Sequence, residues 1–118
     1  MLEYTINSET YQFNAGFAFL REIEKAHTDA AGKENGLLWT MAGVVDRDPE
    51  RLRDALYSMN TNQKPRIDKD TLEHWIEDHE NLEEIFSDVE SFFGNANCTK
   101  TAWTRLQMIV RVAKAAKE

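Results

Sequence analysis

The sequence predicts a mainly α-helical protein of the α+β class. It should form an N-terminal β-hairpin followed by about five helices, packed in a single small domain over residues 1–118. Apolar and polar residues alternate up to Phe13, which is typical of a half-buried strand, and beyond Gly16 apolar residues recur at helical spacing. A chain of 118 residues suits one hydrophobic core and leaves little room for a second.

The first predicted element is a β-hairpin of about residues 2–13. Leu2, Tyr4 and Ile6 alternate with polar residues, the turn-forming stretch NSE follows, and the alternation resumes over residues 10–13. An isolated two-stranded hairpin is only marginally stable in water, so its apolar face must rest on another element. We expect the helix that follows to support it.

That helix is predicted at about residues 14–28, with Asn14 as its N-cap. Its inner stripe at helical spacing comprises Phe17, Leu20 and Ile23, widened by Phe19 and Ala26. The glycines and polar residues of TDAAGKENG, residues 28–36, predict a loop after the helix.

Further helices are predicted at about residues 36–46, 49–60, 68–79, 81–93 and 99–116. The helix at 49–60 has the clearest start, because Asp48 can cap it and Pro49 occupies the first helical position, where a missing N–H costs nothing. Asp68 opens the next helix in the same way.

The ends of the last two helices are predicted from weaker signals. Asn81 and Glu84 have the spacing of a capping box, and Gly94 is expected to close that helix as its C′ residue. Asn97 or Thr99 is expected to cap the final helix.

Composition and charge exclude several classes of function. The formal net charge is −7, which argues against nucleic-acid and anionic-membrane partners, since both need a cationic face. Cys98 is the sole cysteine, so no internal disulfide can form and a reducing compartment is expected. The polar N-terminus has no apolar signal core, and no stretch is long and apolar enough for a membrane span. We therefore expect a cytoplasmic protein.

The charge is unevenly distributed along the chain. Residues 68–90 hold ten acidic residues and one basic one, whereas five Lys or Arg and one Glu follow Thr99. The simplest interpretation of the acidic segment is a solvated helix face. An alternative is that the acidic segment of one copy meets the basic last helix of another, because complementary charge favours association in a fixed register.

No pattern in the sequence predicts catalysis, a cofactor or a metal. His74 and His79 are five positions apart, which places them about 140° from each other around a helix, so they cannot share a metal ion. Cys98 has no histidine near it in sequence. We find no phosphate-binding glycine loop and no nucleophile motif. We accordingly expect a non-enzymatic protein without catalytic, cofactor-binding or metal-binding residues.

The apolar residues suggest a protein that binds other proteins. Trp39, Trp75 and Trp103 are expected in the core. In the last helix an inner stripe of Trp103, Leu106, Ile109 or Val110, and Ala113 is expected to pack inward. The last two helices are apolar on more than one side, so a partner is expected to cover part of them. The candidate partner contacts are Met108, Val112, Arg105, Arg111 and Phe92.

The order of several segments resembles a known family. YTINSETYQFNAGFAFLREIEK, GLLWTMAGVVDRDPERLRDALYSM, KPRIDKDTLEHWIED, NLEEIFSDVESFF and TKTAW follow one another as in the tail assembly chaperones of long-tailed phages and prophages of Gram-positive bacteria. The resemblance implies a non-enzymatic helical protein of the host cytoplasm, absent from the finished virion. Such a protein would coat the tape measure protein, help to recruit tail tube subunits, and often have a longer frameshifted form.

One alternative function remains open on the sequence alone. A small acidic regulator could mimic nucleic acid and occupy a basic partner through residues 68–90. It should be monomeric and lose its partner steeply as salt rises, whereas an assembly protein should self-associate and bind an apolar helix with weak salt dependence.

Overall fold

A two-stranded antiparallel hairpin begins the chain, formed by β1 (Leu2–Ile6) and β2 (Glu9–Phe13). The structure is a computed structural model that describes the backbone of residues 1–26 and 33–117 and the side chains of residues 1–25 and 36–111. Asn7 and Ser8 make the two-residue turn, with φ of 53° and 70°. Positive φ at both central residues gives the turn the twist that a tight hairpin needs.

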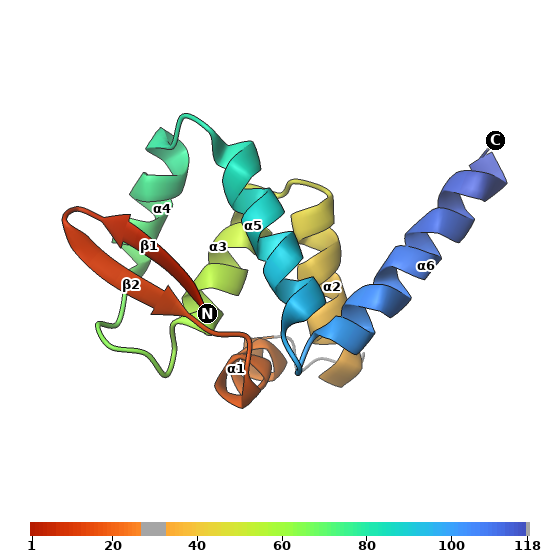
Figure 1. The fold of residues 1–118 in the computed structure, drawn as a ribbon, viewed down its shortest axis with the longest axis horizontal. Coiled ribbons are helices and arrows are strands. Elements are labelled where there is room, and N and C mark those ends of the chain that lie inside the picture. The colour runs from red at the N-terminus through yellow and green to blue at the C-terminus, as the bar shows by residue number, and fades with distance from the viewer. Residues whose placement is uncertain (27–32, 118) are drawn as a thin grey trace.

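Six helices follow the hairpin in the described part of the chain, as Figure 1 shows. They are α1 (Phe17–Ala26), α2 (Lys33–Val45), α3 (Pro49–Met59), α4 (Lys69–Asp78), α5 (Leu82–Asn95) and α6 (Lys100–Lys117). The predicted α+β class, a hairpin followed by packed helices, is confirmed.

The starts of α3 and α4 agree with the sequence. The Asp48 side chain accepts a hydrogen bond from the Glu50 N–H at 3.0 Å, and Pro49 is the first helical residue. Asp68 accepts from the backbone N–H of Thr71 at 3.3 Å and from its hydroxyl at 2.9 Å. Each aspartate satisfies a donor that the first helical turn leaves without an intrahelical partner.

The start of α1 differs from the prediction. The helix begins at Phe17, and the Gly16 carbonyl accepts its first bond, from the Leu20 N–H. Gly16, and not Asn14, therefore occupies the N-cap position. The Asn14 N–H binds the Met59 carbonyl at 2.8 Å and ties the end of the hairpin to the end of α3. The helix α2 begins at Lys33, earlier than expected, so residues 33–36 of the predicted loop are helical; residues 27–32 lie outside the described part.

The predicted C-terminal glycine of α5 lies inside the helix, which continues to Asn95. A Cβ atom at Gly94 would lie 3.2 Å from Cδ1 of Trp103, so this position is small because α6 crosses α5 there. The capping box also fails, since the Asn81 side chain accepts no hydrogen bond from a backbone N–H of the first turn and its amide instead donates to the Glu84 carboxylate at 3.4 Å. The Thr99 hydroxyl donates back to the Phe93 carbonyl at 2.7 Å instead of capping α6.

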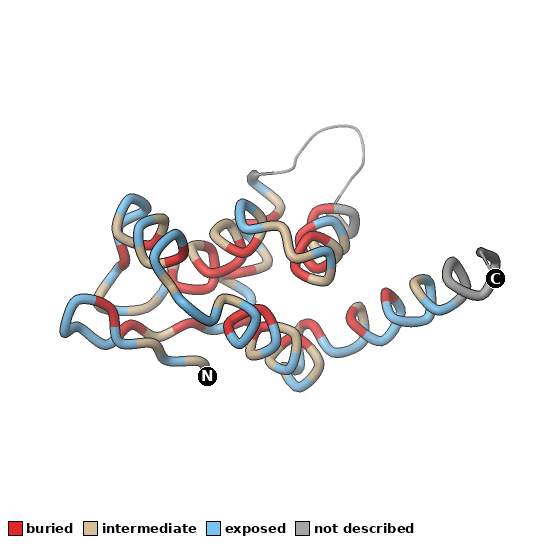
Figure 2. The backbone as a smooth tube through the Cα atoms, turned by 90° about the horizontal axis from the view of Figure 1, so that it is seen from above, coloured by how far each residue is buried: buried red, intermediate tan, exposed pale blue. Residues whose placement is uncertain are grey.

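Helix α2 is the centre of the molecule, because it packs against α1, α3, α5 and α6. Met41 and Val44 of α2 are fully buried. The inner faces of α3 and α5 are apolar at helical spacing, with these residues buried: Leu52, Ala55, Leu56 and Met59 on α3, and Ile85, Phe86, Val89 and Phe93 on α5. Figure 2 shows the buried positions along the helices in the body of the molecule.

The stripe on α1 is rotated from the predicted one. Phe17 is 69% exposed, whereas Phe19 and Ile23 are buried in the core. Phe17 is the first residue of the helix and so lies at its outer end. The Phe19 ring contacts Phe93 of α5 at 6.0 Å between centroids.

The hairpin rests chiefly on α3, α4 and α5, so the expectation that the following helix would support it was wrong. The Tyr4 ring packs on Trp75 of α4 with 5.0 Å between centroids, and its hydroxyl donates to Asp88 of α5 at 2.8 Å. Burial and that hydrogen bond raise the pKa of the Tyr4 phenol, which keeps the donor protonated. On the other side of β2, the Asn60 amide at the end of α3 donates to the Gln12 carbonyl.

Candidate protein-binding site

The described residues hold no obvious reactive centre. Among them, no three His, Cys, Asp or Glu side chains are grouped so that they could hold a metal ion. His74 is exposed, the His79 ring packs edge-on against Trp75 at 5.0 Å, and Cys98 is half-buried in the turn before α6. No helix within the described ranges has the length and apolar character needed to cross a membrane. The candidate site is a surface of exposed apolar side chains on α6.

The base of α6 is anchored in the body of the molecule. Trp103 and Leu106 are buried, and the Trp103 ring contacts Phe93 at 6.0 Å between centroids. Gly94 leaves the space into which Trp103 fits. Beyond this anchor α6 diverges from α2 and α5 and projects away from the body, as Figures 1 and 2 show. We call the residues from Gln107 to the end of α6 the arm.

The arm exposes large apolar side chains. Met108 is 61% exposed and Ile109 is 53% exposed. Of the two alternatives for the inner stripe, Val110 is half-buried and takes the inward position, whereas Ile109 lies about 120° from Trp103 around the helix and does not pack inward. Ala113 and Val112 have side chains outside the described residues. By the helical period Met108 lies about 140° from Trp103 and thus faces away from the core.

The predicted partner contacts fall in different places. Arg105, Met108 and Arg111 are exposed, whereas Phe92 of α5 is half-buried against the core. Arg105 and Met108 come together in a shallow groove of about 540 Å³, whose other lining residues are Gly94, Lys100, Thr101 and Thr104. Phe92 is not one of these lining residues, and the Val112 side chain is outside the described part. The groove joins a positive side chain to an apolar one on the outer face of α6.

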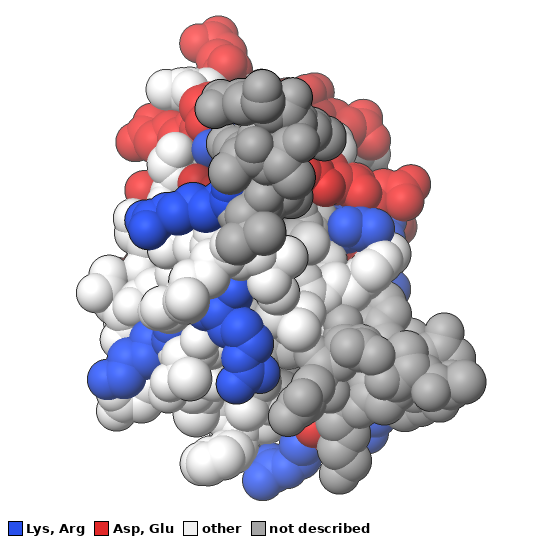
Figure 3. Space-filling view, turned by 90° about the vertical axis from the view of Figure 1, so that its right-hand side faces the viewer, with Lys and Arg blue, Asp and Glu red and all other residues white. Residues whose placement is uncertain are grey.

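The acidic segment lies on α4, α5 and the turn between them. Seen from the α6 end, acidic side chains gather along the top of the molecule and basic ones lie below (Figure 3). Several carboxylates are already engaged by the fold: Asp88 binds Tyr4, and Glu73 binds Arg53 at 2.6 Å. The segment is therefore only partly a solvated face.

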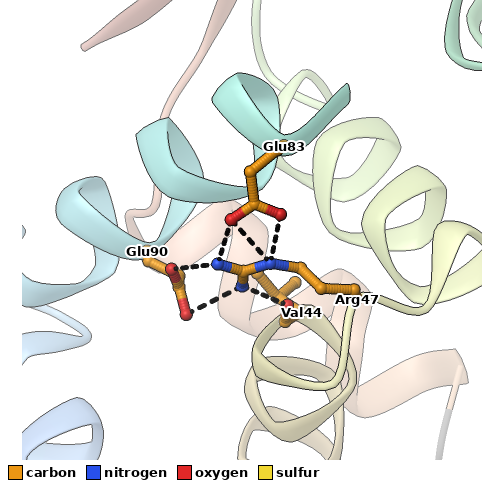
Figure 4. A network of polar contacts seen from close by, with 4 residues as sticks. All are labelled: Val44, Arg47, Glu83 and Glu90. Carbon is orange, nitrogen blue, oxygen red and sulfur yellow. Dashed lines mark hydrogen bonds and ion pairs between the residues drawn. The ribbon is translucent and has the colours of Figure 1, made fainter. Parts of the chain in front are cut away.

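Arg47, in the turn between α2 and α3, pairs with two carboxylates of the acidic segment (Figure 4). Its guanidinium contacts Glu83 at 2.7 Å and Glu90 at 3.0 Å, and it donates to the Val44 carbonyl at 3.1 Å. The hydrogen bond from Arg47 lowers the pKa of Glu83, and the bonds to Glu83 and then Glu90 raise the pKa of Arg47. The cluster ties the α2–α3 turn to Glu83 and Glu90, which are seven residues apart on α5. Its role is structural.

Comparison with protein families identifies the group to which this fold belongs. The family model described as phage tail assembly chaperone protein, TAC, matches residues 3–107. The chain belongs to this family. Comparisons with the curated proteins and with the solved structures give no match.

The family is one of host-cell factors for tail assembly, which indicates interaction with tail proteins and a non-enzymatic role. This favours the assembly chaperone over the acidic regulator. The match ends at residue 107, so the exposed part of the arm from Met108 onward lies beyond it. In this tail assembly chaperone the base of α6 is thus within the common part of the family.

Two surface features of this tail assembly chaperone were not predicted from the sequence. Trp39 was expected in the core but is 45% exposed, and the Arg51 guanidinium stacks on its ring at 3.6 Å from the centroid. The Arg51 side chain lies across Gly43, where a Cβ would collide with it. The apolar character of Trp39 predicted its burial. The sequence signal for a cation–π pair was Arg51, near the start of α3.

The second feature is a cleft of about 250 Å³ between α3 and α4. Its lining residues are Pro49, Glu50, Arg53, Glu73, Ile76 and Glu77. The sequence carries a partial signal for it, since Glu73 and Glu77 are four apart and so share a face of α4 with Ile76 between them. The partner face on α3 could not be read from the sequence.

Proposed function

We propose that this protein is a non-enzymatic tail assembly chaperone of the bacterial host cytoplasm that binds the tape measure protein, contacts the tail tube protein and self-associates. It acts through repeated apolar contacts made by the arm, and it is absent from the mature virion. The observation that carries the proposal is a helix anchored by Trp103 that projects Met108 and Ile109 into solvent. Such an exposed apolar face on a projecting helix favours contact with another amphipathic helix.

The energetics of the arm suit a partner with many equivalent sites. Fully burying a large apolar side chain stabilises a contact by about 1.5–3 kcal/mol, so Met108 and Ile109 give a weak single contact. Several copies on one long partner would bind much more tightly, because each bound copy raises the effective concentration of the next. A long helical protein that repeats an apolar stripe is a partner of this kind.

The test is co-expression of the chain with the tape measure protein from the same phage, followed by affinity capture. Met108→Asp places a charge on the outer face of the arm and should reduce capture by about tenfold or more. Gln107→Asp is the matched control, because it adds the same charge to the neighbouring exposed position, which points away from that face. Circular dichroism should show both variants folded.

Two results would contradict the proposal. Met108→Asp could fold and capture the tape measure protein as well as the unaltered chain does, which would place the contact elsewhere. Gln107→Asp could lose as much capture as Met108→Asp, which would mean that added negative charge, and not loss of an apolar contact, is responsible.

A further inference from the structure

The cleft between α3 and α4 is lined by apolar and acidic residues. Its apolar lining residues are the exposed Pro49 and the buried Ile76, and Glu50 and Glu77 are exposed. The guanidinium of Arg53 is occupied, because it binds Glu73 at 2.6 Å and Asp54 at 2.9 Å. The exposed carboxylates thus give the cleft a negative character, and the chemistry that fits it is an apolar side chain flanked by cations.

The arm has the complementary composition. Met108 and Ile109 supply apolar side chains, and two exposed arginines flank them along the helix: Arg111 within the arm and Arg105 just before it. Helix α6 contains no acidic residue over its whole length. A helix of this kind is attracted to a negative cleft and can also bury apolar area there.

The arm does not reach its own cleft. In Figure 1, α4 lies at the end of the molecule with the hairpin, whereas α6 projects from the opposite end. The molecule extends 46 Å along its longest axis. Two complementary surfaces at opposite ends of a molecule can meet only between different copies. Such a contact is heterologous, so it can repeat from copy to copy.

We infer that the arm of one copy docks in the α3–α4 cleft of a second copy, so that copies join head to tail. This deepens the self-association within the proposed function and rests on it. The second copy is the occupant because both halves of the complementary pair lie on this chain. Charge steers the encounter and sets the register, and Met108 and Ile109 hold the contact, so copy-to-copy docking and tape measure binding compete for the same side chains.

The test uses purified full-length chain without any tail protein. The arm variant carries Arg105→Glu and Arg111→Glu, and the cleft variant carries Glu50→Lys and Glu77→Lys; all four positions are exposed. Sedimentation velocity over a range of concentrations should show that each variant alone needs about tenfold higher concentration to associate. Mixing the two variants should restore association, because the acidic arm then meets the basic cleft and the basic arm meets the acidic cleft.

The control for the cleft variant is Glu3→Lys with Glu9→Lys, which makes the same change in net charge at two exposed positions of the hairpin. It should associate as the unaltered chain does. The inference is overturned if the unaltered chain stays monomeric, if either variant alone associates normally, or if the mixture fails to restore association. The cleft variant retains its arm, so it should still capture the tape measure protein; loss of self-association with retained capture separates this inference from the proposed function.

Discussion

Asn60 joins three parts of the fold through one buried side chain. Its amide nitrogen donates to the Gln12 carbonyl of β2 at 2.9 Å and to the Pro65 carbonyl at 3.2 Å. Its amide oxygen accepts from the Ile67 N–H at 2.6 Å. The hairpin, the end of α3 and the segment leading to α4 therefore share one hydrogen-bonding centre that is fully shielded from water.

Replacing Asn60 by Ala should reduce the free energy of unfolding by about 2–3 kcal/mol, because buried backbone groups of Gln12 and Ile67 lose their partners. Urea denaturation followed by circular dichroism measures the loss. The control is Asn62→Ala at a nearby exposed position, which should stay within about 0.5 kcal/mol of the unaltered chain. Equal losses in the two variants would show that the buried amide has no special role.

The Arg47 cluster predicts a dependence of stability on pH. The pKa of Glu83 is lower in the folded chain than its ordinary value of 4.5, chiefly because Arg47 hydrogen-bonds the carboxylate. A carboxyl group with a lowered folded pKa contributes stability above the ordinary pKa, and that contribution disappears as pH falls through the folded pKa. Glu83→Gln should therefore lower the urea midpoint at pH 7, and the difference from the unaltered chain should shrink steadily below about pH 4.5.

The comparison for this effect is Glu80→Gln, which removes an exposed carboxylate outside the Arg47 cluster. Its difference from the unaltered chain should change less between pH 7 and about pH 3. If the Glu83→Gln difference grew on acidification, the assigned direction of the pKa shift would be wrong.

Among the elements, the hairpin is held in register by its two-residue turn. Ser8 has a φ of 70°, in the left-handed region that glycine enters without steric cost. Ser8→Gly creates the Asn-Gly pair that tight hairpins prefer, so it should raise the free energy of unfolding by about 0.5 kcal/mol. Thermal unfolding followed by circular dichroism measures it.

A glycine in a regular helix should act in the opposite direction. Ser91 is an exposed residue in the middle of α5, and Ser91→Gly should lower the free energy of unfolding by about 0.5 kcal/mol. A stabilising effect at both positions, or at neither, would show that the turn geometry does not decide the result.

The elements themselves could be predicted because their signals are local. The alternation in the hairpin and the caps Asp48 and Asp68 depend on residues close in sequence, and the structure has them as predicted. Gly94 resembles a helix end in sequence, but its small size serves the crossing of Trp103, nine positions later, over the helix. Such a requirement comes from packing and cannot be recognised in the segment alone.

Exposure was harder to predict than secondary structure. Phe17, Trp39 and Ile109 all fit an apolar pattern, yet each is substantially exposed. Periodicity gives the direction in which a side chain points from its helix, but not whether another element lies there. Arg105 and Met108 could be proposed as candidate contacts from the helical pattern of the sequence, whereas the α3–α4 cleft could be recognised only in the structure.

For the whole molecule, the anchored base and the exposed arm of α6 should contribute differently to stability. Ending the chain after Gln107 retains Trp103 and Leu106, so the melting temperature should stay within about 5 °C of the full-length value. Trp103→Ala in the full-length chain removes a buried ring and should lower the melting temperature by about 10 °C or more. Differential scanning calorimetry distinguishes the two. A large loss on shortening the chain would show that the arm is part of the core.

The bond between Tyr4 and Asp88 spans 84 residues of chain, which has a consequence during synthesis. A ribosome adds about 5–20 residues per second, so roughly 4–17 s pass between the addition of Tyr4 and that of Asp88. Trp75 of α4 and the end of α3 also emerge after the hairpin. A two-stranded hairpin is marginal alone, and its edges are open until then. The segment translated first is thus among the last to gain its native contacts, and the nascent chain is most open to strand pairing with a neighbouring polypeptide during that interval.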